Sequence, residues 1–468
     1  MVKSIKPSAS GHKLQKSKAI SFFFFSLLIL IMKIIWLSSQ PGRGILGADG
    51  ENYLTALDGL LREGIFSRED KLSYWPAGYP ILMWPIAKFS LSNFLFLIGS
   101  LQSAFFALVI TFFTVELHRS PLKKFAWPSL FFLSLNPTLS LNSPAIGYEV
   151  SVACLFLLSI TLYMKLIRTK KENVMNVESI VAAISFALSV FMQPRMLLLA
   201  FGVLIPFAIF HYRGKRVAIF LIVSSLLICI SPTILIVRNQ NAIGVPIIST
   251  NLGVTMNIGA GPNATGGYSN EASGVPCNPV SGNTSVQDRH LINCVVHWYL
   301  QNPLDASRLF VSKFVFHWSP WFGPLANGTM ARSPWLRVNP LSDISKTQDG
   351  YEMVYGLLGK SLSWLWLIAT VLLVLIGFWA LRRRGGASSW LAWALFIPVS
   401  LNSLSSMATI GDNRFRVPTA TMSVLLQMFG FYSIFSRKEF KKGIEGEVKL
   451  IYRIKKVSLF AKSSSKKQ

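Results

Sequence analysis

Residues 19–38, AISFFFFSLLILIMKIIWLS, hold one charged side chain, Lys33, in an otherwise apolar run. As an α-helix, 20 residues extend about 30 Å, which matches the hydrocarbon thickness of a bilayer. The whole chain is 51% hydrophobic and only 14% charged, so a soluble fold would need a very large core to hide that surface. The run therefore predicts a membrane-spanning helix, which we interpret as an uncleaved anchor because no small-residue cleavage site follows it.

Further apolar runs of similar length are found along the chain. They lie at 93–117, 126–142, 151–167, 178–194, 196–211, 217–237, 362–381, 389–407 and 417–435. Together with the first run they predict an all-α integral membrane protein with about ten transmembrane helices. The pairs 126–167 and 178–211 contain Pro-bearing breaks, which we interpret as tight turns. A re-entrant kink at either break would lower the count.

The net charge of +26 is placed next to these apolar runs. Most of the 46 Lys and Arg lie in six short segments, at 3–18, 119–124, 165–171, 213–216, 382–384 and from 437 onward. By the positive-inside rule all six are expected in the cytoplasm, in contact with anionic membrane lipids. Nucleic acid is therefore not expected as a partner. The prediction is a multi-pass protein of the cell membrane with both termini cytoplasmic. Its domains are a tail at 1–18, a polytopic domain at 19–436 and a basic tail at 437–468.

This topology leaves two long segments, 39–92 and 238–361, on the non-cytoplasmic side, where function is expected. In the first segment, apolar residues from Tyr53 to Leu61 follow a helical period that Gly64 ends. A short amphipathic helix between two spans is predicted to rest on the membrane surface.

The second outer segment is predicted to contain a similar interfacial helix at 303–318, with Asn302 as its N-cap. Trp318 and Trp321 are expected in the headgroup belt that indoles prefer. The predicted apolar side of this helix consists of Leu304, Val311, Phe314, Val315 and Trp318.

The four cysteines divide into two pairs. Cys154 and Cys229 lie inside apolar runs, where they are expected to pack. Cys277 and Cys294 share the second outer segment, and they predict a disulfide in an oxidising compartment. Two free thiols are the alternative.

Two acidic residues follow the first span directly. Asp49 and Glu51 stand at the predicted start of a helix, where backbone N–H groups and the helix dipole stabilise a carboxylate. Asp49 is therefore expected to be ionised and able to accept a proton or to hold a metal ion. An ordinary N-cap aspartate is the alternative interpretation.

Four arginines, Arg195, Arg238, Arg414 and Arg416, lie at the predicted outer ends of spans. A guanidinium at this level matches the oxygens of a lipid phosphate or pyrophosphate in a bidentate way. Snorkelling to lipid headgroups is the alternative for each arginine. Glu149 lies at a similar level, where pairing with a neighbouring arginine is the simplest explanation.

Several of these residues belong to short motifs. These are Asp49-Gly50-Glu51-Asn52-Tyr53, the segment Tyr74–Pro80, Gly147-Tyr148-Glu149, Gln193-Pro194-Arg195, the glycine-rich stretch from Ile247 to Gly267, and Gly411–Pro418. Together they resemble the glycosyltransferase C superfamily, and in particular its enzymes for lipid-linked sugars, such as protein O-mannosyltransferases and the aminoarabinose transferases of lipid A. The order Gln-Pro-Arg departs from the Arg-Pro that is commoner in this family.

The resemblance implies a membrane glycosyltransferase that moves a sugar from a polyprenyl-phosphate donor to a glycan, lipid or protein acceptor with inversion. Asp49 would be the catalytic base, and Glu51 and Glu149 would orient the acceptor or ligate a divalent cation. The candidate substrate-binding residues are Arg195, Arg238, Arg414, Arg416, Tyr79 and Asn257. A transporter or flippase of lipid-linked sugars is the alternative, but the sequence has few charges within spans and no repeated halves.

Overall fold

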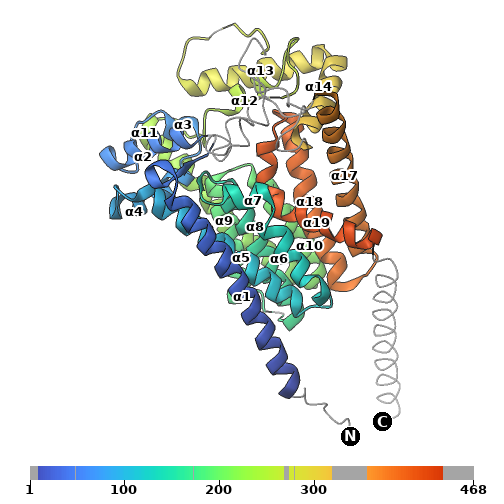
Figure 1. The fold of residues 1–468 in the computed structure, drawn as a ribbon. Coiled ribbons are helices and arrows are strands. Elements are labelled where there is room, and N and C mark those ends of the chain that lie inside the picture. Colours follow the sequence, from blue (N-terminus) through green and yellow to red (C-terminus); the bar gives the residue numbers. More distant parts are fainter. Residues whose placement is uncertain are drawn as a thin grey trace.

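The computed structural model describes residues 9–47, 49–171, 173–267, 274–278, 280–318 and 356–435. Over these residues the protein is a helical bundle, with one short strand pair as its β structure (Figure 1). The predicted belt residue Trp321 and the basic tail at 437–468 lie outside the described residues. The all-α class predicted from the sequence is confirmed.

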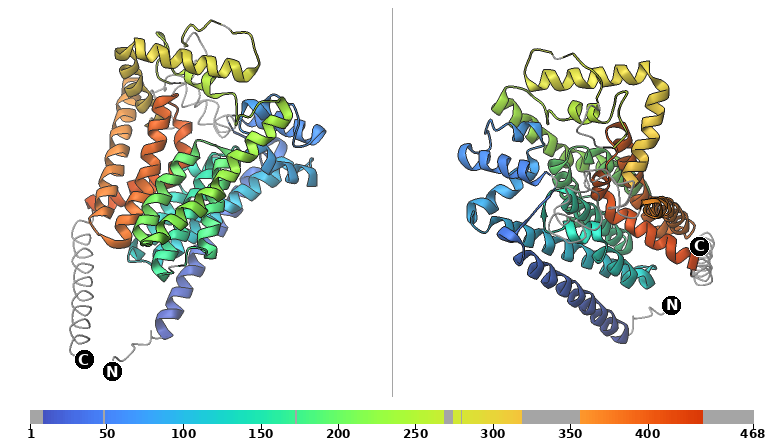
Figure 2. Two further views of the ribbon diagram at one scale, coloured as in Figure 1. Left: turned by 180° about the vertical axis from the view of Figure 1, so that it is seen from behind. Right: turned by 45° about the horizontal axis from the view of Figure 1, so that its top comes forward.

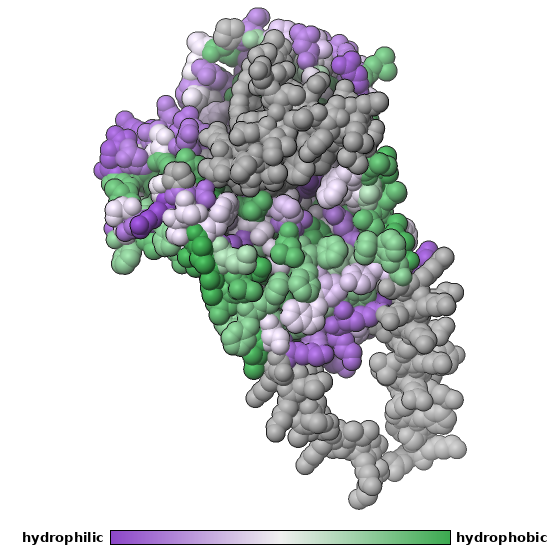
Figure 3. Space-filling view, in the orientation of Figure 1, coloured by the Kyte–Doolittle hydropathy of each residue, from purple (hydrophilic) through white to green (hydrophobic). Residues whose placement is uncertain are grey.

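Seven described helices are long and apolar enough to cross a membrane. They are α1 (Ala9–Ser38), α5 (Phe94–His118), α8 (Glu149–Thr169), α11 (Lys215–Ile243), α17 (Gly356–Arg382), α18 (Gly386–Ala408) and α19 (Ala420–Phe435), the last continuing from the 3₁₀-helix η4 (Asn413–Thr419). Hydrophobic side chains cover the bundle between two more hydrophilic ends (Figure 3). The prediction of a multi-pass membrane protein therefore agrees with the fold.

Three of the ten predicted spans are not among the described helices that are long enough to cross a membrane. The helices α9 (Val177–Met192) and α10 (Met196–His211) have 16 residues each. The run at 126–142 forms two helices, α6 (Ala126–Ser134) and α7 (Pro137–Asn142). The chain breaks before Pro137 because proline lacks the N–H for an internal helix bond and clashes with the preceding turn.

The first outer segment folds as predicted around α2 (Gly50–Glu63). Its C-cap is Gly64, which has a φ of 81° and donates its N–H to the carbonyl of Leu60. The segment also holds the 3₁₀-helix η1 (Pro41–Arg43) and two helices that the sequence pattern did not predict, α3 (Lys71–Tyr74) and α4 (Gly78–Phe89).

The second outer segment contains α12 (Leu252–Ile258), α13 (Thr284–Gln301) and α14 (Pro303–Trp318). The bounds of α14 are those predicted, whereas α13 was not predicted. Figure 2 shows α13 and α14 lying across the end of the bundle. The disulfide between Cys277 and Cys294, which anchors the chain before α13 to that helix, is present as predicted.

The predicted apolar side of α14 is wrong in part. Leu304 and Val311 are exposed, whereas Leu309, Lys313 and His317 are buried. The Nζ of Lys313 is satisfied inside the fold by the hydroxyl of Tyr299, at 2.6 Å. A polar residue with a buried partner can face the interior, which a hydrophobic pattern does not reveal.

The basic segments of the described chain meet at the opposite end of the bundle. The ring of Phe22, near the start of α1, lies 5.7 Å from that of His118 at the end of α5. The end of α5 is joined to the end of α8 by an ion pair between Glu116 and Arg168, at 2.9 Å. Arg384, after α17, lies 5.4 Å from the ring of Phe125. These segments therefore share one face, which we call the basic end.

Candidate functional site

A parallel bridge of two residues aligns the two predicted acidic residues. Strand β1 (Ile45–Leu46) pairs in register with β2 (Ala145–Ile146). Three residues beyond each strand lie Asp49, the N-cap of α2, and Glu149, the first residue of α8. A Cβ on Gly47 would come within 2.1 Å of a β2 carbonyl oxygen, so only glycine permits this close approach.

Arg414 joins these two carboxylates. Its Nη1 lies 2.9 Å from Oδ2 of Asp49, and its Nε lies 3.9 Å from Oε1 of Glu149. The Arg414 side chain is 21% exposed and the Asp49 side chain 16%. Asp49 occupies the N-cap position but makes no capping hydrogen bond with its side chain. The side chain of Asp49 therefore does not act as an ordinary N-cap. It forms an ion pair with Arg414 instead, and because both side chains are largely buried, water screens this pair only weakly.

Short-range contacts fix the position of Arg414. The Oδ1 of Asp412 accepts the backbone N–H of Arg414 at 2.9 Å and so caps η4. From α18, the side-chain amide of Asn402 donates to the carbonyl of Phe415 at 2.7 Å and to the hydroxyl of Thr419 at 3.1 Å. The arginine is thus carried on a turn that is bonded to the preceding helix.

Arg195 adds a second guanidinium near the pair. Its Cζ lies 4.5 Å from the centre of the Phe415 ring, next to Arg414 in the sequence. The Nε and Nη2 atoms of Arg195 are buried and have no hydrogen-bond partner within the described chain, and the same holds for Nε of Arg414. Buried donors without partners are costly, and a bound ligand that supplies acceptor oxygens would satisfy them.

Three tyrosines line the carboxylates. The ring of Tyr53 lies 5.0 Å from that of Tyr79 and 6.4 Å from that of Tyr148. The hydroxyl of Tyr79 accepts the N–H of Gly147 at 2.8 Å, which holds the backbone two residues before Glu149. Burial raises the pKa of all three tyrosines, and nearby carboxylates raise the pKa of Tyr53 further. The phenols therefore stay neutral, and Tyr79 positions the site rather than titrating in it.

The glycine-rich stretch packs against the segment that carries Arg414. The carbonyl of Gly266 accepts the N–H of Gly411 at 2.9 Å. A Cβ on Gly259 would lie 2.1 Å from the carbonyl oxygen of Thr409, and Gly266 has a φ of +94° beside the Ser312 hydroxyl. Because these glycines have no side chain, the backbone of the second outer segment can pack directly against the backbone at the end of α18.

Arg238 has a different role from the one predicted. Its guanidinium donates to the backbone carbonyls of Ile65, Ser67 and Leu72 and to the side chain of Asn239. Four of the five donors of an arginine are thereby used. Arg238 anchors the chain that follows α2 instead of presenting its guanidinium to a phosphate.

The other predicted residues also have defined surroundings. Arg416 is buried and donates to the carbonyl of Trp318 at 3.0 Å, so it ties η4 to the end of α14. The Oδ1 of Asn257 accepts the N–H of Val275 at 2.9 Å. Glu51 is exposed in the first turn of α2.

His317 is a residue of this region that sequence reasoning missed. Its side chain is fully buried on α14, and burial together with Arg416 and Arg195 lowers its pKa well below the usual range. The imidazole is therefore neutral near pH 7. The available signal was its spacing of four from Lys313 and eight from Leu309, which puts all three on one helix face.

A metal site is not formed by clustered ligands in the described part of the chain. No group of three or more His, Cys, Asp or Glu is placed to hold an ion there. Asp49 and Glu149 are two carboxylates, and Arg414 supplies the positive charge between them.

No protein-family model and no curated protein matches this chain.

Proposed function

We propose that the protein is a membrane glycosyltransferase that transfers a sugar from a polyprenyl-phosphate donor to an acceptor hydroxyl on the non-cytoplasmic face, with inversion. The supporting observation is one cluster that combines a carboxylate, Asp49, with the guanidinium groups of Arg195 and Arg414. Among the described residues, Nε and Nη2 of Arg195 and Nε of Arg414 are buried and have no hydrogen-bond partner. The substrate class comes from the resemblance of the sequence motifs, and the cluster offers the chemistry that such a transfer needs.

In this mechanism Asp49 accepts the proton of the acceptor hydroxyl as the oxygen attacks the anomeric carbon of the sugar. The bond from that carbon to the lipid phosphate oxygen breaks, and the phosphate leaves with the electron pair. Arg195 and Arg414 stabilise the negative charge that develops on the leaving phosphate. Glu149 keeps Arg414 close to Asp49 and is available to orient the acceptor.

The contacts narrow the set of candidate residues. Arg238, with its donors used by backbone carbonyls, and Tyr79, which holds Gly147, act as positioning residues. Arg416 and Asn257 hold the outer segments in place. We therefore assign the direct chemistry to Asp49, Arg195 and Arg414.

The alternative of a lipid-linked sugar transporter receives no support from the charge inside the first span. Lys33 donates to the carbonyl of Ser140 and to the hydroxyl of Ser143, the latter at 2.8 Å, and lies 5.1 Å from the ring centre of Phe106. These bonds tie α1 to the C-terminal end of α7. A charge engaged in this way serves packing rather than a transport path.

We also propose the orientation in the cell membrane: the basic end and both termini face the cytoplasm, and α6 with α7, α9 and α10 complete ten crossings. The test is a pair of matched variants, Arg308→Cys on α14 and Arg383→Cys at the basic end, with Cys229 replaced by serine. An impermeant thiol reagent applied to intact cells should label the first and spare the second. Labelling in the opposite pattern would invert the orientation.

The test of the function uses Asp49→Asn in the purified full-length protein, supplied with a panel of polyprenyl-phosphate sugars. Release of lipid phosphate should fall by about 10² to 10⁴, the usual loss when a general base is removed. Asp58→Asn on the same helix is the matched control, because Asp58 is exposed and forms a surface ion pair with Arg62. If Asp49→Asn and Glu149→Gln both retained turnover, the proposed mechanism would be wrong.

A further inference from the structure

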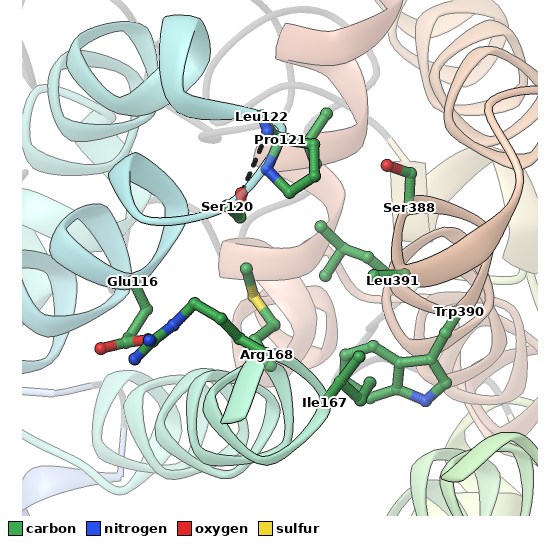
Figure 4. A pocket seen from close by; sticks show the side chains of 11 residues that line it. Glu116, Ser120, Pro121, Leu122, Ile167, Arg168, Ser388, Trp390 and Leu391 are labelled. Atoms are coloured by element: carbon green, nitrogen blue, oxygen red, sulfur yellow. Dashed lines mark hydrogen bonds and ion pairs between the residues drawn. The ribbon is translucent and has the colours of Figure 1, made fainter. Parts of the chain in front are cut away.

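The basic end contains a cavity of about 210 Å³ between α5, α8 and α18 (Figure 4). Its walls are largely apolar and include Leu122, Met164, Ile167 and Leu391. Arg168, at its edge, is 19 residues after Glu149 on α8, which corresponds to roughly 28 Å along the helix. The cavity is therefore separate from the cluster around Asp49.

The charge at the edge of this cavity is positive after local pairing. Glu116 is buried, and its carboxylate is contacted by Arg119 at 2.8 Å and by Arg168 at 2.9 Å. Glu116 and Arg168 line the cavity, and Arg119, which lies outside the lining, gives this ion-pair cluster one positive charge in excess. The bonds from Arg168 to Glu116 use Nε and Nη2, so its Nη1 makes no hydrogen bond with the described residues.

The start of α18 brings further donors to the same cavity. The N-cap, Gly385, provides no side-chain capping bond, and Ala387 and Ser388 of the first turn line the cavity. The first N–H groups of a helix have no intrahelical partner, and the helix dipole favours an anion at this end. These donors require an acceptor from outside the helix.

Ser388 is an independent indication of a ligand. The residue is 2% exposed, and its hydroxyl points into the cavity in Figure 4. Its Oγ forms no hydrogen bond with any residue that the structure describes. The hydroxyl is therefore available to donate to or accept from an occupant of the cavity.

We propose that this cavity is a binding site for the phosphate headgroup of an anionic membrane lipid. Phosphate oxygens accept hydrogen bonds from the first turn of α18, from Ser388 and from the free Nη1 of Arg168. The volume of about 210 Å³ is below the range of about 300 to 1,000 Å³ typical of pockets for drug-sized ligands, which fits a headgroup rather than a whole lipid. The apolar walls accommodate the adjoining glycerol and the first acyl carbons.

The experiment measures binding to the purified full-length protein in a neutral detergent. Short-chain phosphatidylglycerol is titrated, with phosphatidylcholine of the same chain length and inorganic phosphate as comparison ligands, and protein melting temperature is the readout. Phosphatidylglycerol should raise the melting temperature in a saturable way, and phosphatidylcholine should not. A rise with inorganic phosphate as well would identify the phosphate group as the recognised part.

The variant Ser388→Leu fills the cavity and should weaken phosphatidylglycerol binding by about tenfold or more, the equivalent of one hydrogen bond to a charged group. The matched control is Ser389→Leu, at the next position, which does not line the cavity. If Ser388→Leu does not fold, Ala387→Leu, at an exposed position of the lining, carries the same expectation. Equal affinity in the wild type, the cavity variant and the control would overturn the proposal, as would equal responses to the two lipids.

Discussion

Both ends of α8 join acidic residues to arginines, but the ratio of charges is reversed. At the basic end, one carboxylate, Glu116, is contacted by two arginines, and its oxygens are satisfied. At the outer end, two carboxylates, Asp49 and Glu149, share Arg414. Buried guanidinium nitrogens of Arg195 and Arg414 have no hydrogen-bond partner there among the residues that the structure describes. A fully bonded buried pair holds helices together, whereas an incompletely bonded one is expected where a substrate completes it.

The largest expected effect on stability is at the satisfied end. Glu116→Gln removes the buried charge that pairs with Arg119 and Arg168, whose side chains are 45% and 35% exposed. The free energy of unfolding should fall by about 1.5 to 3 kcal/mol, the contribution of hydrogen bonds to a charged group. Asp49→Asn should cost much less, because its partner Arg414 keeps Glu149 nearby. Denaturant unfolding of both variants in detergent tests the contrast. Equal losses would show that the two ends do not differ in the way proposed.

A smaller effect is expected on donor use at the unsatisfied end. Arg414→Ala should weaken use of the polyprenyl-phosphate donor by about 1.5 to 3 kcal/mol, the contribution of a charge-assisted hydrogen bond. Arg414→Lys should restore part of this loss, since the ammonium keeps the charge but lacks the planar fork. Initial rates over a range of donor concentrations give the measurement. Unchanged donor dependence in Arg414→Ala would remove this arginine from the proposed mechanism.

The smallest effect calibrates the other two. Arg62 and Asp58 form an ion pair at 3.0 Å on the surface of α2, with side chains that are 58% and 64% exposed. Removing it with Arg62→Ala should change the unfolding free energy by about 0.3 to 0.5 kcal/mol, and less at high salt. Unfolding measured at two salt concentrations checks this value. If Arg62→Ala lowered the unfolding free energy as much as Glu116→Gln, the burial of the ion pair would not explain how much each pair stabilises the protein.

Local sequence signals predicted several elements well. The bounds of α14 follow from Pro303 and a helical period, and the end of α2 follows from Gly64, whose backbone is left-handed. The division of the run at 126–142 into α6 and α7 has a local cause as well, the Pro-bearing break at Pro137 that the sequence shows. The buried side of α14 could not be predicted, since it depends on Tyr299 as the partner of Lys313.

The candidate site was predictable in its residue types but not in its contacts. Asp49, Glu149 and Arg414 were identified from their positions at predicted span ends. Asp49 and Glu149 lie close together because β1 pairs with β2, which joins segments 100 residues apart. Each strand has two residues, which is too short for a strand pattern to be recognised in the sequence. The role of Arg238 likewise depends on carbonyls far away in the chain, which no local pattern reveals.

The anchoring of Arg238 has a mechanical consequence. Because this residue of α11 holds the carbonyls of the loop after α2, the 29-residue helix and the first outer segment are expected to shift together. A long helix adjusts its tilt when the bilayer becomes thicker or thinner. Such a change of tilt is then expected to reach α2 and its N-cap, Asp49, through the loop, so that the thickness of the surrounding membrane acts on the geometry of the carboxylate.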